Sequence, residues 1–172
     1  MAAYYRASQY GMKNSVGYLV RRSSNLVLPQ MESLFADQTL SFSQWVTLMA
    51  LRDGEITTAA DLARNICHDA GSLTRILDQL EDRSLIARQR SVTDRRVVSL
   101  TLTAQGRALI DSLMPRVVNF WNGLLEEFSH DEVRTLIKLL TRLTSAAEGR
   151  RDLAEPQGTS SSRTNQRRKV SA

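Results

Sequence analysis

The sequence has little cysteine, little histidine and no long apolar run, and each shortage excludes a class of protein. Its single cysteine, Cys67, rules out an intrachain disulfide framework and favours a reducing compartment. No apolar run is long enough for a membrane span, and the polar, tyrosine-rich residues 1–14 lack the hydrophobic core of a signal peptide. We therefore expect a cytoplasmic protein that does not bind a membrane.

The chain also lacks a recognisable set of catalytic or metal-binding residues. Its only histidines, His68 and His130, do not have metal-ligand spacing with Cys67. We find neither a glycine-rich phosphate loop nor a nucleophile motif. The sequence therefore predicts a protein that is not an enzyme and has no metal site and no cofactor.

The net charge of +5 is concentrated in two places. The chain has 172 residues, enough for one domain with its own core. Residues 156–172 carry four basic side chains and no acid, and subtracting them from +5 leaves only +1 for residues 1–155. Between residues 83 and 106, five arginines face a single acid, Asp94. These arginines are Arg83, Arg88, Arg90, Arg95 and Arg96. Such local clustering, rather than the total charge, points to a nucleic-acid partner.

Capping residues and apolar spacing predict the order of the elements. A long first helix covers residues 16–34, and Pro29 should kink or divide it. Ser41 and Gln44 form a capping box ahead of a helix over residues 42–52. Thr58 and Asp61 begin a short helix that ends near Cys67, and Asp69 caps another helix after a turn of about two or three residues, the spacing of a helix-turn-helix. Alternation of Val98, Leu100 and Leu102 then predicts a hairpin.

The C-terminal part predicts an oligomer. Two apolar helices follow Thr103, and a capping box of Ser129 and Glu132 opens the second. Together with the first helix they would expose a large apolar surface unless a second subunit covered it, which favours a homodimer. Beyond Gly149 the sequence is too polar to offset its ordering entropy and is predicted to be disordered.

Over residues 16–147 this order of elements resembles the MarR family of bacterial transcription regulators. The resemblance is carried by Leu73-Thr74-Arg75 with Leu80-Glu81, and by Asp94-Arg95-Arg96 followed by Leu100-Thr101-Leu102-Thr103 and Gly106. Ser84 departs from the family pattern, which commonly has glycine there to close the preceding helix. The resemblance implies a mainly α fold with a small β-hairpin wing, that is, a winged helix-turn-helix with long N- and C-terminal dimerisation helices.

The resemblance also implies a domain division and a function. The expected parts are an N-terminal arm and dimerisation helix (1–38), a winged helix-turn-helix DNA-binding domain (39–103), C-terminal dimerisation helices (104–148) and a disordered basic tail (149–172). The implied function is that of a ligand-responsive regulator, a homodimeric repressor that binds a near-palindromic operator. A small effector, with aromatic and phenolic acids as candidates, would release it. Its expected partners are double-stranded DNA, a second copy and that effector.

The candidate DNA contacts lie on one helix and in the hairpin. A major groove admits one α-helix, so Ser72, Thr74 and Arg75 can reach base edges or phosphates, and the choice between these stays open for Arg75. Arg88 and Arg90 add positive charge along the first strand. Beyond them Asp94 can hold one guanidinium extended while another meets a phosphate.

The resemblance gives these hairpin residues roles. Arg96 would enter the minor groove and Asp94 would orient it. Arg95 is then the arginine that is left to contact phosphate. The alternative is a solvated turn with a weak surface ion pair.

For the effector, the resemblance suggests a pocket between the first helix, the Trp45 helix and the long helix after Gly106. An aromatic slot with one guanidinium would suit a small aromatic carboxylate. The candidate lining residues are Tyr18, Arg22, Trp45, Met114 and Trp121. Alternatively, Trp45 belongs to the core and Arg22 is a surface or intersubunit charge.

Two other functions remain open at this point. Cys67 beside His68 would be reactive as a thiolate, so a redox-responsive regulator is one alternative, against which a buried structural cysteine must be weighed. The other is a winged-helix module that binds proteins and not DNA.

Overall fold

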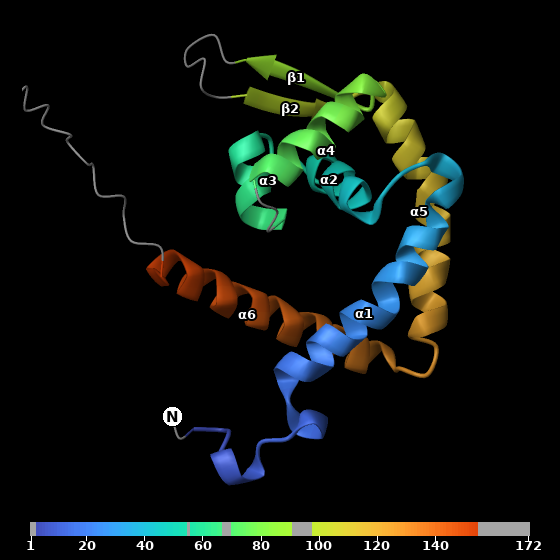
Figure 1. Cartoon of the computed structure of the whole chain (residues 1–172). Helices are drawn as coiled ribbons and strands as arrows, with labels where there is room; N and C mark the ends of the chain where they lie inside the picture. The colour runs from blue at the N-terminus through green and yellow to red at the C-terminus, as the bar shows by residue number, and fades with distance from the viewer. Residues whose placement is uncertain (1–2, 55, 67–69, 91–97, 155–172) are drawn as a thin grey trace, which may run out of the picture. The chain divides into compact units, whose positions relative to one another are not determined.

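The computed structural model describes residues 3–54, 56–66, 70–90 and 98–154, and it divides into two compact units, Met1–Asn122 and Gly123–Ala172. The elements are shown in Figure 1. The helices are α1 (Val16–Leu34), α2 (Phe42–Arg52), α3 (Ala59–Ile66), α4 (Ala70–Asp82), α5 (Ala104–Leu124) and α6 (His130–Ala154). Strands β1 (Ile86–Arg90) and β2 (Val98–Leu102) form an antiparallel hairpin, and a short 3-10 helix, η3 (Ala36–Gln38), joins α1 to α2. This is the mainly α, winged helix-turn-helix fold that the sequence predicts.

Helix starts follow the predicted caps. Ser41 Oγ accepts from the Gln44 backbone N–H while Gln44 Oε1 accepts from Ser41 N–H, which confirms the capping box of α2. Ser129 and Glu132 make the same reciprocal pair before α6, and the hydrogen bonds that the Ser129 hydroxyl and backbone N–H donate to the Glu132 carboxylate lower the pKa of Glu132. At α3 the pattern differs, because Asp61 accepts from the Thr58 hydroxyl and not from its backbone; that bond lowers the pKa of Asp61.

One helix keeps its predicted bounds and another runs further than predicted. Helix α1 runs from Val16 to Leu34, as predicted, and Pro29 lies inside it without dividing it. Helix α6 passes the predicted boundary at residue 148 and ends at Ala154. A single glycine at position 149 costs a helix only about 1 kcal/mol relative to alanine, too little to end one whose neighbours favour the helix.

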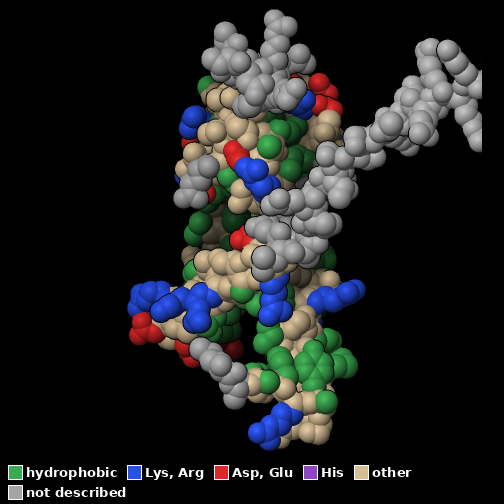
Figure 2. Space-filling view, turned by 90° about the vertical axis from the view of Figure 1, so that its left-hand side faces the viewer, with side chains coloured by type: hydrophobic (Ala, Val, Ile, Leu, Met, Phe, Trp, Pro, Cys, Tyr) green, Lys and Arg blue, Asp and Glu red, His purple; other side chains and the backbone are tan. Residues whose placement is uncertain are grey.

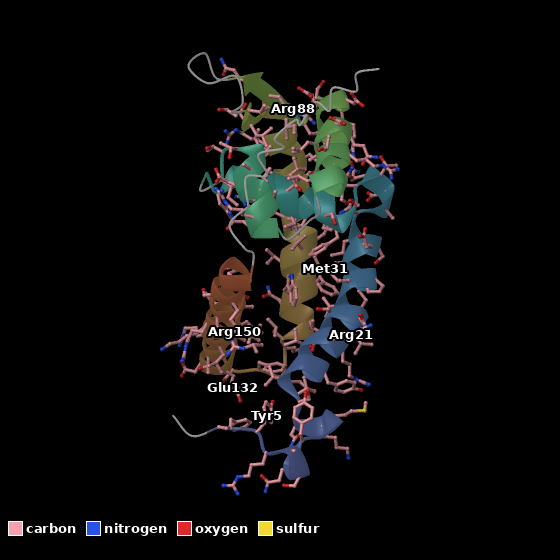
Figure 3. All side chains as sticks on the ribbon, turned by 60° about the vertical axis from the view of Figure 1, so that its left-hand side comes forward. Tyr5, Arg21, Met31, Arg88, Glu132 and Arg150 are labelled. Atoms are coloured by element: carbon pink, nitrogen blue, oxygen red, sulfur yellow. The ribbon has the colours of Figure 1, made fainter. Side chains whose placement is uncertain are left out.

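The core of the first unit forms where α1, α2, α4, the hairpin and α5 meet. Phe35 stacks on Trp45 with ring centroids 5.2 Å apart, and both side chains are buried. Met31 is buried where α1 passes α5 (Figure 3). Ile110 and Leu113 supply the buried face of α5. These contacts place α4 and the hairpin on one continuous core.

The connection from α4 to β1 needs a left-handed residue, and Ser84 supplies it with φ of 56°. Its N–H donates to Glu81 O and the Leu85 N–H donates to Leu80 O, which closes the end of α4. The Thr103 hydroxyl donates to Ser84 O and accepts from Gly106 N–H. The serine that departs from the family pattern therefore adopts the backbone conformation that glycine usually provides.

Helix α6 has an unpartnered apolar stripe within its own unit. Its exposed apolar residues are Leu136, Ile137, Leu139, Leu140 and Leu143.

In the part of the chain that the structure describes, we find no helix that is both apolar enough and long enough to cross a membrane.

Acid should weaken one tertiary link in the first unit. Arg116 Nη1 of α5 donates to both carboxylate oxygens of Asp37 in η3, at 2.8 and 2.9 Å, and this bond is the main reason that the pKa of Asp37 lies below 3.8. Because the pKa is lowered by folding, the carboxylate stabilises the fold above pH 3.8, and this contribution is lost as the pH falls through the folded-state pKa. We expect Asp37→Asn to unfold at lower urea than the parent at pH 7, but at nearly the same urea once the Asp37 carboxyl of the parent is protonated.

The control is Asp111→Asn, an exposed aspartate of α5 with no ion pair among the described residues. It should not change the midpoint at either pH. A constant difference between Asp37→Asn and the parent across the titration would contradict the prediction.

Candidate nucleic-acid interface

Helix α4 has an apolar face and a polar face. Its buried residues are Leu73, Ile76, Leu77 and Leu80, each exposed by 8% or less. Ser72, Thr74 and Arg75 occupy intervening positions and are all exposed. Helix α3 ends at Ile66 and α4 begins at Ala70, so the two helices are joined by only three residues. The predicted contacts therefore lie on the exposed side of the second helix of a helix-turn-helix.

A backbone hydrogen bond joins the hairpin to the segment before α3. Strand β2 pairs with β1 from Ile86↔Leu102 to Arg90↔Val98, and Leu100 N–H also donates to Thr57 O, just before α3, at 2.8 Å. In Figure 1 the hairpin extends beyond α4 as a wing. The wing is therefore hydrogen-bonded to the segment that leads into the helix-turn-helix.

Arg88 joins the wing to α4. Its Nη2 lies 2.6 Å from Asp78 Oδ1, and its Nε lies 3.2 Å from Glu81 Oε2 (Figure 3). The Nε–Glu81 contact is an ion pair without hydrogen-bond geometry, because the buried Nε has no hydrogen-bond partner. Two carboxylates thus balance the charge of Arg88, which in this arrangement orients the strand relative to α4. Its predicted DNA contact stays a prediction.

Several predicted residues lie outside the described part of the chain. These are Asp94, Arg95 and Arg96 in the hairpin loop, together with Cys67 and His68 between α3 and α4. The backbone of Arg90 is described as the last position of β1, opposite Val98, whereas its side chain is not.

The structure does not bring the five effector candidates into one pocket. Trp45 is 5% exposed and stacks on Phe35, so it is a core residue. Arg22 precedes the inward-facing Met31 by nine residues, two and a half helical turns, and therefore lies on the opposite side of α1. Met114 is half-buried against the core, whereas Trp121 is exposed and makes an edge contact with Phe120.

Two of the candidates do lie together. Arg22 Nη1 donates to the Tyr18 hydroxyl at 3.2 Å. With Arg21, Asn25 and Leu26 they line an open hollow of about 360 Å³ on α1. This hollow contains a phenol and guanidinium groups and no carboxylate.

Sequence reasoning missed the polar contacts that hold α4 from its other side. Gln44 Nε2 of α2 donates to Gln79 Oε1 of α4 at 2.9 Å, and Gln44 is buried. Arg83 donates to the backbone oxygens of Gln38 and Thr39 at 2.9 and 3.0 Å. Gln44 was recognised only as a cap and Arg83 only as one of a cluster of arginines. No local pattern could have indicated either contact, since the partners lie 35 to 45 residues apart.

The fold, with an exposed polar face on α4, is that of the winged helix-turn-helix class, which includes DNA-binding transcription regulators. The model of the MarR family matches residues 40–98. The chain is 32% identical over 104 residues to the uncharacterised HTH-type transcriptional regulator YdgJ of Bacillus subtilis, covering 60% of this chain and 63% of that protein. It is 31% identical over 106 residues to the HTH-type transcriptional repressor NicR of Pseudomonas putida, covering 62% and 67%.

Solved structures agree with these relatives. BpsR of Bordetella bronchiseptica, whose DNA binding is regulated by 6-hydroxynicotinic acid, superposes with a TM-score of 0.69 at 27% identity, covering 78% of this chain and 96% of that one. A MarR variant from E. coli in complex with operator DNA gives a TM-score of 0.66 at 25% identity, covering 74% and 92%. The chain belongs to the MarR family, and its relatives are transcription regulators.

Proposed function

We propose that the protein is a homodimeric transcriptional repressor that binds a near-palindromic operator and leaves it when a small effector binds. The observation that carries this proposal is the division of α4 into a buried apolar face and an exposed face with Ser72, Thr74 and Arg75. An α-helix of this kind fits a major groove. Arg96 would enter the adjacent minor groove, with Asp94 orienting it and Arg95 on phosphate.

Dimerisation is supported by apolar surface on the long helices. On α1, Val16, Leu19, Val20, Leu26 and Leu28 are between 40% and 57% exposed, and α6 carries the stripe described above. Figure 2 shows hydrophobic side chains at the surface over the N-terminal part of the first unit. A two-fold dimer that covers these faces would present two copies of α4, about one helical turn apart along DNA.

The hollow at Tyr18 and Arg22 supports an aromatic acid as effector. A guanidinium can bind a carboxylate with two hydrogen bonds, and a phenol ring offers a flat apolar contact. BpsR is regulated by 6-hydroxynicotinic acid, a compound of this chemical class. Tyr18 and Arg22 are the lining residues that we retain for this role.

Operator binding is measured by fluorescence anisotropy with DNA from the region upstream of the chain's own coding sequence. A repressor should bind it with nanomolar affinity, and log affinity should fall linearly with log salt because counterions are released. Small aromatic and phenolic acids are then added to the complex. If purified protein binds neither this DNA nor genomic fragments in a salt-sensitive manner, the interaction-module alternative replaces the proposal.

The dimer is tested with Leu140→Lys. Each subunit would lose about 1.5–3 kcal/mol of leucine burial, and a two-fold interface contains this leucine twice, so the dimer Kd should rise by at least about 100-fold. Analytical ultracentrifugation measures this change. Ser145→Lys is the control, since Ser145 lies nine residues from Leu136 and therefore on the opposite side of α6. Equal dissociation of both variants would argue against this stripe as the interface.

A further inference from the structure

The short helix η3 is the point where polar contacts from the end of α4 and from α5 meet. It is separated from α1 by Phe35 alone, and its C-cap is Thr39, whose φ of 48° is left-handed. Arg83, at the end of α4, donates one guanidinium hydrogen bond to Gln38 O and one to Thr39 O. These are backbone oxygens at the end of a helical turn, where no later N–H of that turn can reach them. Arg83 therefore binds the end of α4 to the connection between α1 and α2.

Helix α5 binds the same turn from another direction. Arg116 Nη1 contacts both carboxylate oxygens of Asp37 and also lies 3.3 Å from Leu34 O, the last residue of α1. Arg116 and Asp37 are separated by 79 residues in sequence. Any movement of α5 along α1 must therefore stretch a contact to η3.

A third contact holds α4 to α2. Gln44 Oε1 is committed to the capping box of α2, and its amide Nε2 donates to Gln79 Oε1 on α4. Since Gln44 is buried, its amide would be left without a partner if α4 shifted. The contact thus joins the first turn of α2, the next helix after η3, to the last turn of α4.

These hydrogen bonds define the position and rotation of α4, which apolar packing alone defines less well. Burial of Leu73, Ile76, Leu77 and Leu80 holds α4 on the core, but hydrophobic burial is non-directional and resists sliding weakly. Hydrogen bonds at 2.9 to 3.0 Å are directional and define both position and rotation.

We infer that η3 transmits displacement of α5 to α4, with Arg83 and Gln79 as positioning residues for the DNA-reading helix. Asp37 and Arg116 form the input of this relay, and its output is formed by Gln79 of α4 and by Arg83, the residue directly after α4. Its consequence for DNA rests on the proposed function, whereas the coupling between the helices does not.

The relay is tested first without DNA, by hydrogen exchange of the amides of α4 in the full chain. Arg83→Met and Arg116→Met keep the apolar stem and remove every donor. Because each removes a hydrogen-bonded contact of modest net strength, we expect both to speed exchange in the last turns of α4 by about tenfold. Arg107→Met is the matched control on α5, since Arg107 is exposed and has no ion pair among the described residues. It should leave α4 unchanged.

The decisive variant is Arg116→Met, because Arg116 contacts η3 and not α4. Faster exchange of α4 in Arg83→Met alone overturns the relay from α5, and unchanged exchange in both variants overturns the whole inference. If the parent protein binds no DNA, the proposed function is wrong. The hydrogen-exchange result would still test the coupling between α5 and α4.

Gln79 separates positioning from direct DNA contact. Gln79→Glu keeps the oxygen that accepts from Gln44, whereas Gln79→Leu removes it. A positioning role predicts parent-like exchange of α4 in Gln79→Glu and exchange about tenfold faster in Gln79→Leu, with operator affinity falling more than affinity for unrelated DNA in the latter. Equal loss on both DNAs with unchanged exchange would assign Gln79 to phosphate contact and overturn its positioning role.

Discussion

Gly106→Ala is expected to unfold the protein at a markedly lower temperature. A Cβ at this position of α5 would lie 2.1 Å from Leu85 O and 2.9 Å from Leu102 Cδ2. The first atom is backbone and cannot rotate away, so either α5 or the start of β1 must move. Leu85 O also accepts from Thr103 N–H and the Thr103 hydroxyl, so the displacement would break the cap of α5.

We expect a loss of about 3 kcal/mol, the upper part of the range for overpacking, which corresponds to a fall in Tm of roughly 6–12 °C for a protein of this size. Differential scanning calorimetry measures it. Gly123→Ala, in the same helix with no heavy atom within 4 Å of its Cβ, is the control and should keep or slightly raise the Tm. If the two variants have the same Tm, close packing of α5 on the hairpin does not explain the glycine at position 106.

Arg75→Ala should give the largest loss of operator affinity among the described residues of α4. Arg75 is exposed next to the buried Leu73 and Ile76, so its removal leaves the packing of α4 intact. A bidentate contact to guanine is worth about 1–3 kcal/mol, so affinity should fall roughly 5- to 150-fold. Fluorescence anisotropy at matched salt measures this, with Arg107→Ala, an exposed arginine of α5, as the control.

The pattern of loss identifies the atom that Arg75 binds. A base contact predicts relaxed discrimination at one position of the operator, whereas a phosphate contact predicts a uniform loss and a salt slope smaller by about one. Unchanged affinity for the operator at every salt concentration would remove Arg75 from the interface.

Local signals predicted the elements that place this interface. Capping pairs such as Ser41 with Gln44 act within four residues, so the sequence contains all the information they need. The face of α4 follows from the spacing of four apolar residues. Ser84 shows the limit of a family pattern, since its left-handed backbone is provided by a residue that the pattern disfavours.

Contacts between distant segments could not be predicted in this way. Trp45 was a reasonable ligand candidate because an aromatic residue on a helix fits either a pocket or a core. Only the stacking of Phe35, which lies between α1 and η3, on the Trp45 ring decides for the core. The bonds from Arg83 and Arg116 to η3 and its flanking residues join segments 44 to 82 residues apart, and no periodicity records such pairing.

The hydrogen bond from Leu100 N–H to Thr57 O also bears on the risk that the wing aggregates through an exposed strand edge. A hairpin that extends toward DNA would ordinarily leave the outer backbone of its second strand open to pairing with strands of other molecules, which promotes aggregation. The bridge between Thr58 and Ser99 and the bond at Leu100 cover that backbone with the segment that leads into α3. The chain that begins the helix-turn-helix thus also protects the edge of the sheet.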